Sequence, residues 1–138
     1  SSDLDVVLVS AAPDENDILH WKGVIIGPPN SYYENGVFYL SLEFPDGYPI
    51  YPPKVKFTTP IFHPNVYTNG DICLDILQNQ WAASCAVSAI LHSILILLEE
   101  PNPASPANHQ AADLFTSSRE EFARRARQCA ADSRTPTE

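Results

Sequence analysis

Basic residues are scarce in this sequence of 138 residues: eight lysines and arginines stand against seventeen aspartates and glutamates, for a net charge of -9. Proteins that bind nucleic acid directly hold the phosphates with clustered cations, and this chain has few to offer. The deficit is uneven, because residues 1–113 carry thirteen acids and three lysines, whereas residues 114–138 carry all five arginines. The composition therefore argues against direct binding of nucleic acid.

Cysteine is also sparse, with three residues and no CxxC motif. Cys73, Cys85 and Cys129 are an odd and widely spaced set, so we predict neither a disulfide framework nor a metal site. We expect a protein of a reducing compartment. Cys85 and Cys129 stand among alanines in segments predicted to be helical, and we interpret them as packing residues.

Long hydrophobic runs and methionine are both absent. The longest apolar run, residues 94–98, is far shorter than the roughly 20 residues that a membrane-spanning helix needs. No charged and then apolar leader opens the chain. We therefore expect a soluble protein that is neither exported nor membrane-bound, and the Ser1-Ser2 start suggests a processed or trimmed end.

Two β-branched-rich segments open the chain and indicate an antiparallel hairpin. Residues 6–11 and 21–26 are separated by the turn-forming residues 13–17. In residues 38–44 apolar side chains alternate with Tyr, Ser and Glu, as in a strand with one buried face. Residues 54–57 alternate Lys with Val and Phe between flanking prolines, which belong at strand ends. These segments predict a four-stranded antiparallel meander.

The C-terminal half predicts three helices. Apolar residues recur at three- and four-residue spacing over residues 87–98, which indicates an amphipathic central helix with Ser84 as its cap. Ser105-Pro106 is read as the cap and first residue of a second helix. Ser118 and Glu121 have the spacing of a capping box that opens a third. Strands followed by helices, without repeat or linker, indicate one α+β domain.

Residues 61–83 follow neither period but are too apolar for a solvated linker, so we expect an ordered loop packed on the core. The loop contains His63-Pro64-Asn65 and, after seven intervening residues, Cys73. A cysteine attacks through its thiolate, which nearby cations favour. Asp71 and Asp75 instead place negative charge on both sides of Cys73. The sequence therefore predicts a thiol without strong activation, which suits thioester exchange better than a protease-like Cys-His pair.

The spacing of His63-Pro64-Asn65 and Cys73 resembles the signature of ubiquitin-conjugating enzymes. Further pieces resemble the same family, in order, along nearly the whole chain: Gly27-Pro28, Phe44-Pro45, Tyr48-Pro49, Pro52-Pro53, Cys73-Leu74-Asp75-Ile76-Leu77, Trp81 and Pro101-Asn102-Pro103. Within the family, the most similar group is the Rad-six-like branch, which modifies lysines of histones and of the replication clamp and acts in DNA repair. The stretches that carry this likeness are Asn65-Val66-Tyr67, Leu77-Gln78-Asn79 and residues 100–108.

The resemblance implies that Cys73 is a covalent centre. Cys73 would accept the C-terminal carboxyl of ubiquitin from an activating enzyme as a thioester and pass it to a substrate lysine, usually with a ubiquitin ligase. Asn65 would support the tetrahedral oxyanion through its side-chain amide, either directly or by holding the neighbouring loop. His63 and Pro64 would fix the turn that aims Asn65. We interpret His63 as a brace, because a lone histidine more often satisfies a backbone hydrogen bond than performs catalysis.

Four further positions take roles from the resemblance. Asp75 would lie near the approaching ammonium group, and Asn102 near the bound ubiquitin tail. Ser105 stands where many relatives carry an aspartate, and we do not expect it to act as a general base; a helix cap is an equally good interpretation. Ser10, on the first strand, matches the rear surface where relatives bind a second ubiquitin weakly.

The chain also departs from the family pattern. Residues 1–5 alone precede the first predicted strand, so we expect the amphipathic first helix that contacts the activating enzyme to be absent or trimmed. Ile50 and Tyr51 make one ligase-facing loop more apolar than usual. In a second such loop, Ala82 and Ala83 replace the Ser-Pro that follows the tryptophan in relatives. The choice of ligase is therefore expected to differ.

The expected fold is α+β: a four-stranded antiparallel meander with C-terminal helices and no first helix, forming one catalytic core domain over residues 1–138. The expected partners are ubiquitin, an activating enzyme, a ligase and substrate lysines in the cytoplasm and nucleus. We expect no cofactor, no metal, no membrane and no direct nucleic acid. Two alternatives stay open, a catalytically impaired ubiquitin-binding variant and a conjugating enzyme for another ubiquitin-like modifier.

Overall fold

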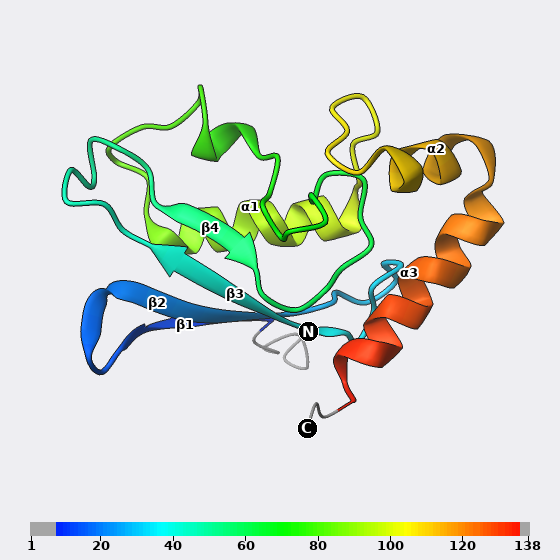
Figure 1. The fold of residues 1–138 in the computed structure, drawn as a ribbon, viewed down its shortest axis with the longest axis horizontal. Coiled ribbons are helices and arrows are strands. Elements are labelled where there is room, and N and C mark those ends of the chain that lie inside the picture. Colours follow the sequence, from blue (N-terminus) through cyan, green and yellow to red (C-terminus); the bar gives the residue numbers. More distant parts are fainter. Residues whose placement is uncertain (1–7, 136–138) are drawn as a thin grey trace, which may run out of the picture.

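The structure is a computed structural model that describes residues 8–135. Within this range, four strands form one antiparallel sheet in the order β1-β2-β3-β4, and three α-helices follow them in the chain. Helix α1 crosses one face of the sheet, while α2 and α3 lie together at one end of it (Figure 1). The elements are β1 (Val9–Asp14), β2 (Asp17–Ile26), β3 (Val37–Glu43), β4 (Lys54–Phe57), α1 (Val87–Glu99), α2 (His109–Ser117) and α3 (Arg119–Ser133).

This architecture confirms the predicted α+β fold, with its antiparallel meander and C-terminal helices. The expectation that the family's first helix is missing concerns residues 1–5, which lie outside the described residues. None of the helices between residues 8 and 135 is both long and apolar enough to cross a membrane.

The first hairpin is tighter than the sequence predicts. β1 and β2 pair as far as Asp14 and Asp17, so that Glu15 and Asn16 alone remain in the turn. The Asp14 carboxylate accepts a hydrogen bond from the Asn16 N–H at 2.9 Å, which holds this short turn. Pro13 was expected in the turn but lies in β1, an edge strand where its missing N–H need not break the ladder.

Alternation along β3 places one set of its side chains in the core, as predicted. Phe38, Leu40 and Leu42 are buried, whereas Tyr39 and Glu43 are exposed. Burial of one such apolar side chain stabilises the fold by about 1.5–3 kcal/mol relative to leaving it in water. The buried residues of α1 that complete this core are Ile90, Leu91, Ile94 and Leu98.

The second C-terminal helix begins later than the sequence predicts. α2 starts at His109, and the Asn108 side chain accepts a hydrogen bond from the Ala111 N–H at 3.0 Å, so Asn108 and not Ser105 is its cap. The reason lies in the preceding loop. The Ala107 and Asn108 N–H groups both donate to the Pro64 carbonyl, at 2.8 and 3.0 Å, which ties this stretch to another loop before the helix can begin.

The other two helix starts also differ in detail. α1 begins after Ala86, which caps it without a side-chain hydrogen bond, so the prediction of Ser84 as cap is wrong. α3 begins directly after Ser118, as predicted, but Ser118 makes no side-chain capping bond. The expected reciprocal capping box does not form, because the Glu121 carboxylate accepts two hydrogen bonds from the Arg124 guanidinium, at 2.9 and 2.6 Å.

The long loop of residues 61–83 is ordered and packed on the core, as predicted. Val66, Ile72 and Leu74 are buried in it, and a short 3-10 helix, η2 (Asp75–Leu77), interrupts it. The loop lies beside β4 (Figure 1), where the Phe57 N–H donates to the Gly70 carbonyl at 2.8 Å. The core thus holds the segment that carries the candidate site.

Candidate functional site

Residues 65–73 form a small irregular hairpin that sets Asn65 opposite Cys73. Val66 and Ile72 pair as an antiparallel bridge, and the Cys73 N–H donates to the Asn65 carbonyl at 2.8 Å. Gly70 closes the hairpin with a φ of +100°, and a Cβ there would lie 2.1 Å from the Phe57 carbonyl oxygen. Glycine is therefore required at this turn. The seven residues between Asn65 and Cys73 are those that form the turn and bridge of this hairpin.

The Asn65 side chain is buried, at 1% exposed, and clamps the loop of residues 102–105. Its Nδ2 donates to the Asn102 carbonyl at 2.7 Å and to the Ser105 carbonyl at 3.0 Å. Its Oδ1 accepts from the Asn102 N–H at 2.8 Å. Both amide hydrogens are therefore used on backbone carbonyls. Of the two roles that the resemblance implies, this geometry favours holding the neighbouring loop.

His63 is fully buried and joins α1 to the same hairpin. Its Nε2 lies 2.8 Å from the Leu97 carbonyl, and its Nδ1 accepts from the Asn65 N–H at 2.9 Å. A carbonyl can only accept, so Nε2 carries the proton and Nδ1 is bare. Burial lowers the pKa of His63 to about 4, which keeps the ring neutral at physiological pH. With both ring nitrogens occupied, His63 acts as a brace for Asn65.

Pro64 links the hairpin to the start of α2. Its carbonyl is the acceptor for the N–H groups of Ala107 and Asn108, at 2.8 and 3.0 Å. The three predicted residues His63, Pro64 and Asn65 therefore bind three different places: the end of α1, the start of α2 and the loop before it. Their contacts fix the position of the strand that faces Cys73.

Cys73 is a free, half-buried cysteine. Cys129 is also free, but its sulfur accepts from the Phe62 N–H at 3.3 Å and lies 3.4 Å from the Pro60 carbonyl, and burial raises its pKa. Cys129 is thus committed to packing, as predicted. Cys73 differs from Cys129 in its position, because it lies opposite Asn65 on the hairpin. Its position makes it the candidate for chemistry.

The structure brings two further predicted residues to the site and places a third beside it. Asn102 and Ser105 are exposed, on the loop whose backbone Asn65 holds. The Asn102 side chain accepts from the Ala104 N–H at 3.1 Å, which stiffens that loop. Asp75 is exposed and opens η2, two residues beyond Cys73. Asn102 and Ser105 are thus tied to the hairpin through Asn65, and Asp75 is close to Cys73 in the chain.

Tyr33 belongs to this site although no sequence pattern marked it. Its ring stacks on His63, with centroids 5.4 Å apart and an interplanar angle of 27°. Its hydroxyl donates to the Phe62 carbonyl at 2.6 Å. Tyr33 comes from the loop between β2 and β3, and the one signal in the sequence was a pair of tyrosines in an otherwise polar, Gly- and Pro-containing loop.

The two predicted ligase-facing segments lie next to each other. The Trp81 indole N–H donates to the Pro49 carbonyl at 3.0 Å, which joins the loop after β3 to the loop after η2. Ile50 and Tyr51 are 68% and 65% exposed on the first of these loops. Ala82 and Ala83 are exposed on the second. The fold thus assembles one mainly apolar surface from two segments about thirty residues apart.

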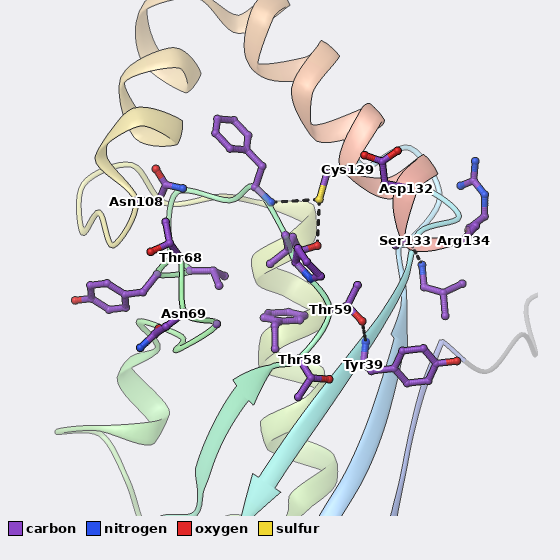
Figure 2. Close-up of a pocket in the computed structure, with 18 of the residues that line it drawn as sticks. Tyr39, Thr58, Thr59, Thr68, Asn69, Asn108, Cys129, Asp132, Ser133 and Arg134 are labelled. Atoms are coloured by element: carbon purple, nitrogen blue, oxygen red, sulfur yellow. Dashed lines mark hydrogen bonds between the residues drawn. The ribbon is translucent and has the colours of Figure 1, made fainter. Parts of the chain in front are cut away.

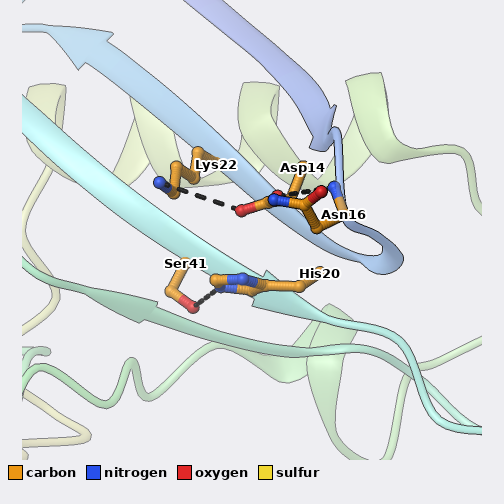
Figure 3. Close-up of polar contacts among 5 residues, drawn as sticks. All are labelled: Asp14, Asn16, His20, Lys22 and Ser41. Atoms are coloured by element: carbon orange, nitrogen blue, oxygen red, sulfur yellow. Dashed lines mark hydrogen bonds and ion pairs between the residues drawn. The ribbon is translucent and has the colours of Figure 1, made fainter.

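Ser10 lies on the rear of the sheet. It is exposed in the middle of β1, while its neighbours Val9 and Ala11 pack against the core, so its side chain points away from α1. The same face carries polar contacts near the first hairpin (Figure 3): Lys22 lies 3.9 Å from Asp14, and His20 hydrogen-bonds the Ser41 hydroxyl at 2.9 Å. The sheet separates this face from the side that α1 covers.

A cleft of about 1220 Å³ borders the tip of the Cys73 hairpin (Figure 2). Its walls come from the loop after β4, the hairpin tip and the C-terminal end of α3, and include Thr59, Asn69 and Ser133. Neither Cys73 nor Asn65 lines it. Between residues 8 and 135, no three His, Cys, Asp or Glu side chains gather in a way that could hold a metal ion.

Two comparisons with known proteins point to the same family. Residues 3–130 match the family described as ubiquitin-conjugating enzyme. The chain is 54% identical over 120 residues to Ubiquitin-conjugating enzyme E2 1 of Caenorhabditis elegans, a match that covers 87% of this chain and 62% of that protein. The chain thus spans less than two thirds of that relative's length. A match of this extent, across the hairpin on which Asn65 and Cys73 face each other, shows that the chain belongs to the ubiquitin-conjugating enzyme family.

Proposed function

We propose that this chain accepts ubiquitin as a thioester on Cys73 from an activating enzyme and transfers it to substrate lysines. The observation that carries the proposal is the hairpin that sets a half-buried, free thiol opposite Asn65. The family membership shown above supports transferase chemistry. The assignments of Cys73, Asn65, His63 and Pro64 to that chemistry are proposals for this chain.

Loading is a thiol–thioester exchange. The Cys73 sulfur attacks the carbonyl carbon that links ubiquitin to the activating enzyme, a new S–C bond forms, and the activating enzyme's sulfur leaves as a thiolate that takes up the proton. The two sulfur nucleophiles are alike, so the exchange is close to thermoneutral and needs no powerful base. This fits a thiol flanked by Asp71 and Asp75 rather than by cations.

Transfer replaces sulfur with nitrogen. A substrate lysine, as the free amine, attacks the Cys73 thioester and forms a tetrahedral oxyanion. The S–C bond then breaks with Cys73 leaving as the thiolate, an isopeptide bond remains, and the amine proton leaves to solvent. We propose that Asn65 assists by holding the 102–105 loop in place, so that Asn102 and Ser105 border the path of the reactants. Asp75 would attract the incoming ammonium group before it loses its proton.

The partner surfaces are proposals of the same kind. Ile50, Tyr51, Ala82 and Ala83 would form the ligase contact, because they are exposed on loops that the Trp81 hydrogen bond joins. Ser10 would mark a weak second ubiquitin surface on the rear of the sheet. We also propose membership of the Rad-six-like branch, with substrates on chromatin and in DNA repair, and action in the cytoplasm and nucleus, where three free cysteines stay reduced.

A loading assay tests the central proposal. Incubation with activating enzyme, ubiquitin and ATP should give an adduct one ubiquitin heavier that thiol reductants remove. Cys73→Ala should abolish the adduct, while the matched variants Cys85→Ala and Cys129→Ala should keep it. Absence of any adduct, or its survival in Cys73→Ala, would reject the proposal. Preference for another activating enzyme and its modifier in the same assay would indicate a different cargo.

A further inference from the structure

We propose that Tyr33 is a positioning residue for the Cys73 hairpin, acting through His63 and Asn65 from beneath the site. The inference rests on the proposed function, since the step it would affect is transfer from Cys73. Tyr33 is fully buried and belongs to a loop that is forty residues earlier in the chain than Cys73.

Hydrogen bonds and close backbone packing hold the loop between β2 and β3 that carries Tyr33. Its ends are joined because the Gly27 N–H donates to the Gly36 carbonyl at 2.9 Å, and the Gly36 N–H in turn donates to the Tyr33 carbonyl at 2.9 Å. A Cβ on Gly27 would lie 1.7 Å from the Tyr33 carbonyl oxygen. The Tyr33 backbone therefore packs against Gly27, where only glycine fits. This close packing fixes the backbone from which the Tyr33 side chain enters the core.

Tyr33 contacts two consecutive residues of the site loop. Its ring stacks on His63, and Phe38 packs edge-on against Tyr33, with the two ring centroids 6.1 Å apart. Its hydroxyl donates to the Phe62 carbonyl at 2.6 Å. Burial raises the pKa of the Tyr33 hydroxyl well above its usual value, so the group remains a donor at physiological pH. Phe62 and His63 are thus held at both the backbone and the ring.

Two further hydrogen bonds connect His63 to Cys73. The fixed His63 ring presents Nδ1 to the Asn65 N–H at 2.9 Å, and the Asn65 carbonyl accepts the Cys73 N–H at 2.8 Å. Loss of the stacked ring would let the His63 ring tilt or change tautomer, which would loosen Asn65 and the loop it clamps. Small displacements of a reacting group can cost up to about a hundredfold in rate.

The test compares Tyr33→Leu and Tyr33→Phe with a matched neighbour. Tyr32 is half-buried, packs on Phe115 and Phe122, and hydrogen-bonds Arg119 through its hydroxyl, so Tyr32→Leu and Tyr32→Phe remove similar groups on the other side of the loop. Each variant is loaded with ubiquitin, and discharge to free lysine is followed over a range of lysine concentrations, at a temperature where all variants are folded. The nitrogen chemical shifts of the His63 ring report its tautomer independently of any activity.

The proposal predicts that Tyr33→Leu lowers the maximal discharge rate about tenfold with little change in the lysine KM, and that the His63 nitrogen signals shift or broaden. Tyr33→Phe keeps the stacked ring but loses the hydrogen bond to the Phe62 carbonyl, so its rate should lie between those of Tyr33→Leu and wild type, with His63 signals close to native. Wild-type discharge in Tyr33→Leu, or an equal loss in Tyr32→Leu, would overturn it. If Tyr33→Leu fails to fold, Tyr33→Phe must discharge more slowly than Tyr32→Phe, and equal rates would overturn it.

The two proposals fail in different ways. If wild-type protein never forms the thioester, the proposed function is wrong, and the His63 signals still show whether Tyr33 positions the ring. If wild-type protein loads and discharges normally but Tyr33→Leu leaves both the rate and the His63 signals unchanged, the proposed function stands and the role of Tyr33 is wrong.

Discussion

Two buried polar side chains, His63 and Asn65, hold the loops of the candidate site together. Each is buried and each has its hydrogen-bonding groups paired with backbone. A buried polar group left without a partner costs about 1–3 kcal/mol, so these contacts stabilise one arrangement of the loop strongly against others. Among the described residues, every buried side-chain nitrogen and oxygen has a hydrogen-bond partner.

The buried imidazole makes stability depend on pH. The pKa of His63 is lowered by burial from 6.5 to about 4, so the unfolded chain takes up a proton that the folded chain excludes. The stability that this ring contributes is complete above about pH 6.5 and is lost as pH falls towards 4, by up to about 3 kcal/mol. His63→Gln, which stays neutral, should reduce that dependence. Urea unfolding of both proteins across this range checks it, and equal pH slopes would contradict the assignment.

The Asn65 clamp predicts two linked effects of Asn65→Ala. Loss of the amide should release the 102–105 loop and slow discharge of the Cys73 thioester to free lysine by up to about a hundredfold, the cost of a small misplacement of reacting groups. The Asn102 N–H loses its acceptor and should exchange with solvent faster. Asn79→Ala, at an exposed asparagine in the same long loop, is the control. Slow discharge with unchanged exchange at Asn102 would argue against the brace and for direct contact with the oxyanion.

Whole elements could be predicted from the sequence where a period dominates. The alternation of residues 38–44 and the stripe of residues 87–98 both appear as predicted, because burial of one face decides the structure locally. The first residue of a helix was harder to predict than the helix itself. Ser105 and Asn108 are both good caps by residue type, and the choice between them depends on hydrogen bonds to Pro64, which is about forty residues away.

This competition between caps predicts a clear difference in stability. Asn108→Ala removes the side chain that accepts from the Ala111 N–H and should lower the free energy of unfolding by about 1 kcal/mol. Ser105→Ala removes no capping bond and should change it by less than about 0.5 kcal/mol. Chemical denaturation of the two variants measures both values. A larger loss in Ser105→Ala than in Asn108→Ala would show that α2 begins earlier than described.

In the candidate site, too, residues that are close in the sequence could be predicted, and residues that only tertiary contacts bring together could not. The pairing of Asn65 with Cys73, the proposed nucleophile, could be predicted because both residues lie on one short hairpin with a fixed spacing. Tyr33 could not, because it reaches the site through tertiary contact from another loop and shares no spacing with it. The same holds for the Trp81 contact that joins the two predicted ligase-facing loops, since Trp81 and Pro49 carry no local sign of each other.

On the scale of the whole molecule, burial rather than charge holds the fold together. The described residues contain two ion pairs, Lys22 with Asp14 and Arg124 with Glu121, and in each the basic side chain is largely exposed, so such pairs contribute little. The core instead joins one face of the sheet, α1 and the long loop. The same layout places the Cys73 hairpin on the core side and Ser10 on the opposite face of the sheet, so the two predicted ubiquitin contacts do not compete for space.

The central claim is that the sulfur of Cys73 carries the acyl group, and Cys73→Ser tests it most directly. A hydroxyl in the same place forms an oxygen ester, which thiol reductants leave intact and alkali cleaves. With activating enzyme, ubiquitin and ATP, intact-mass measurement should show wild-type protein gaining one ubiquitin that reductant removes, and Cys73→Ser gaining one that only alkali removes. A reductant-sensitive adduct on Cys73→Ser would place the reactive sulfur elsewhere and contradict the account.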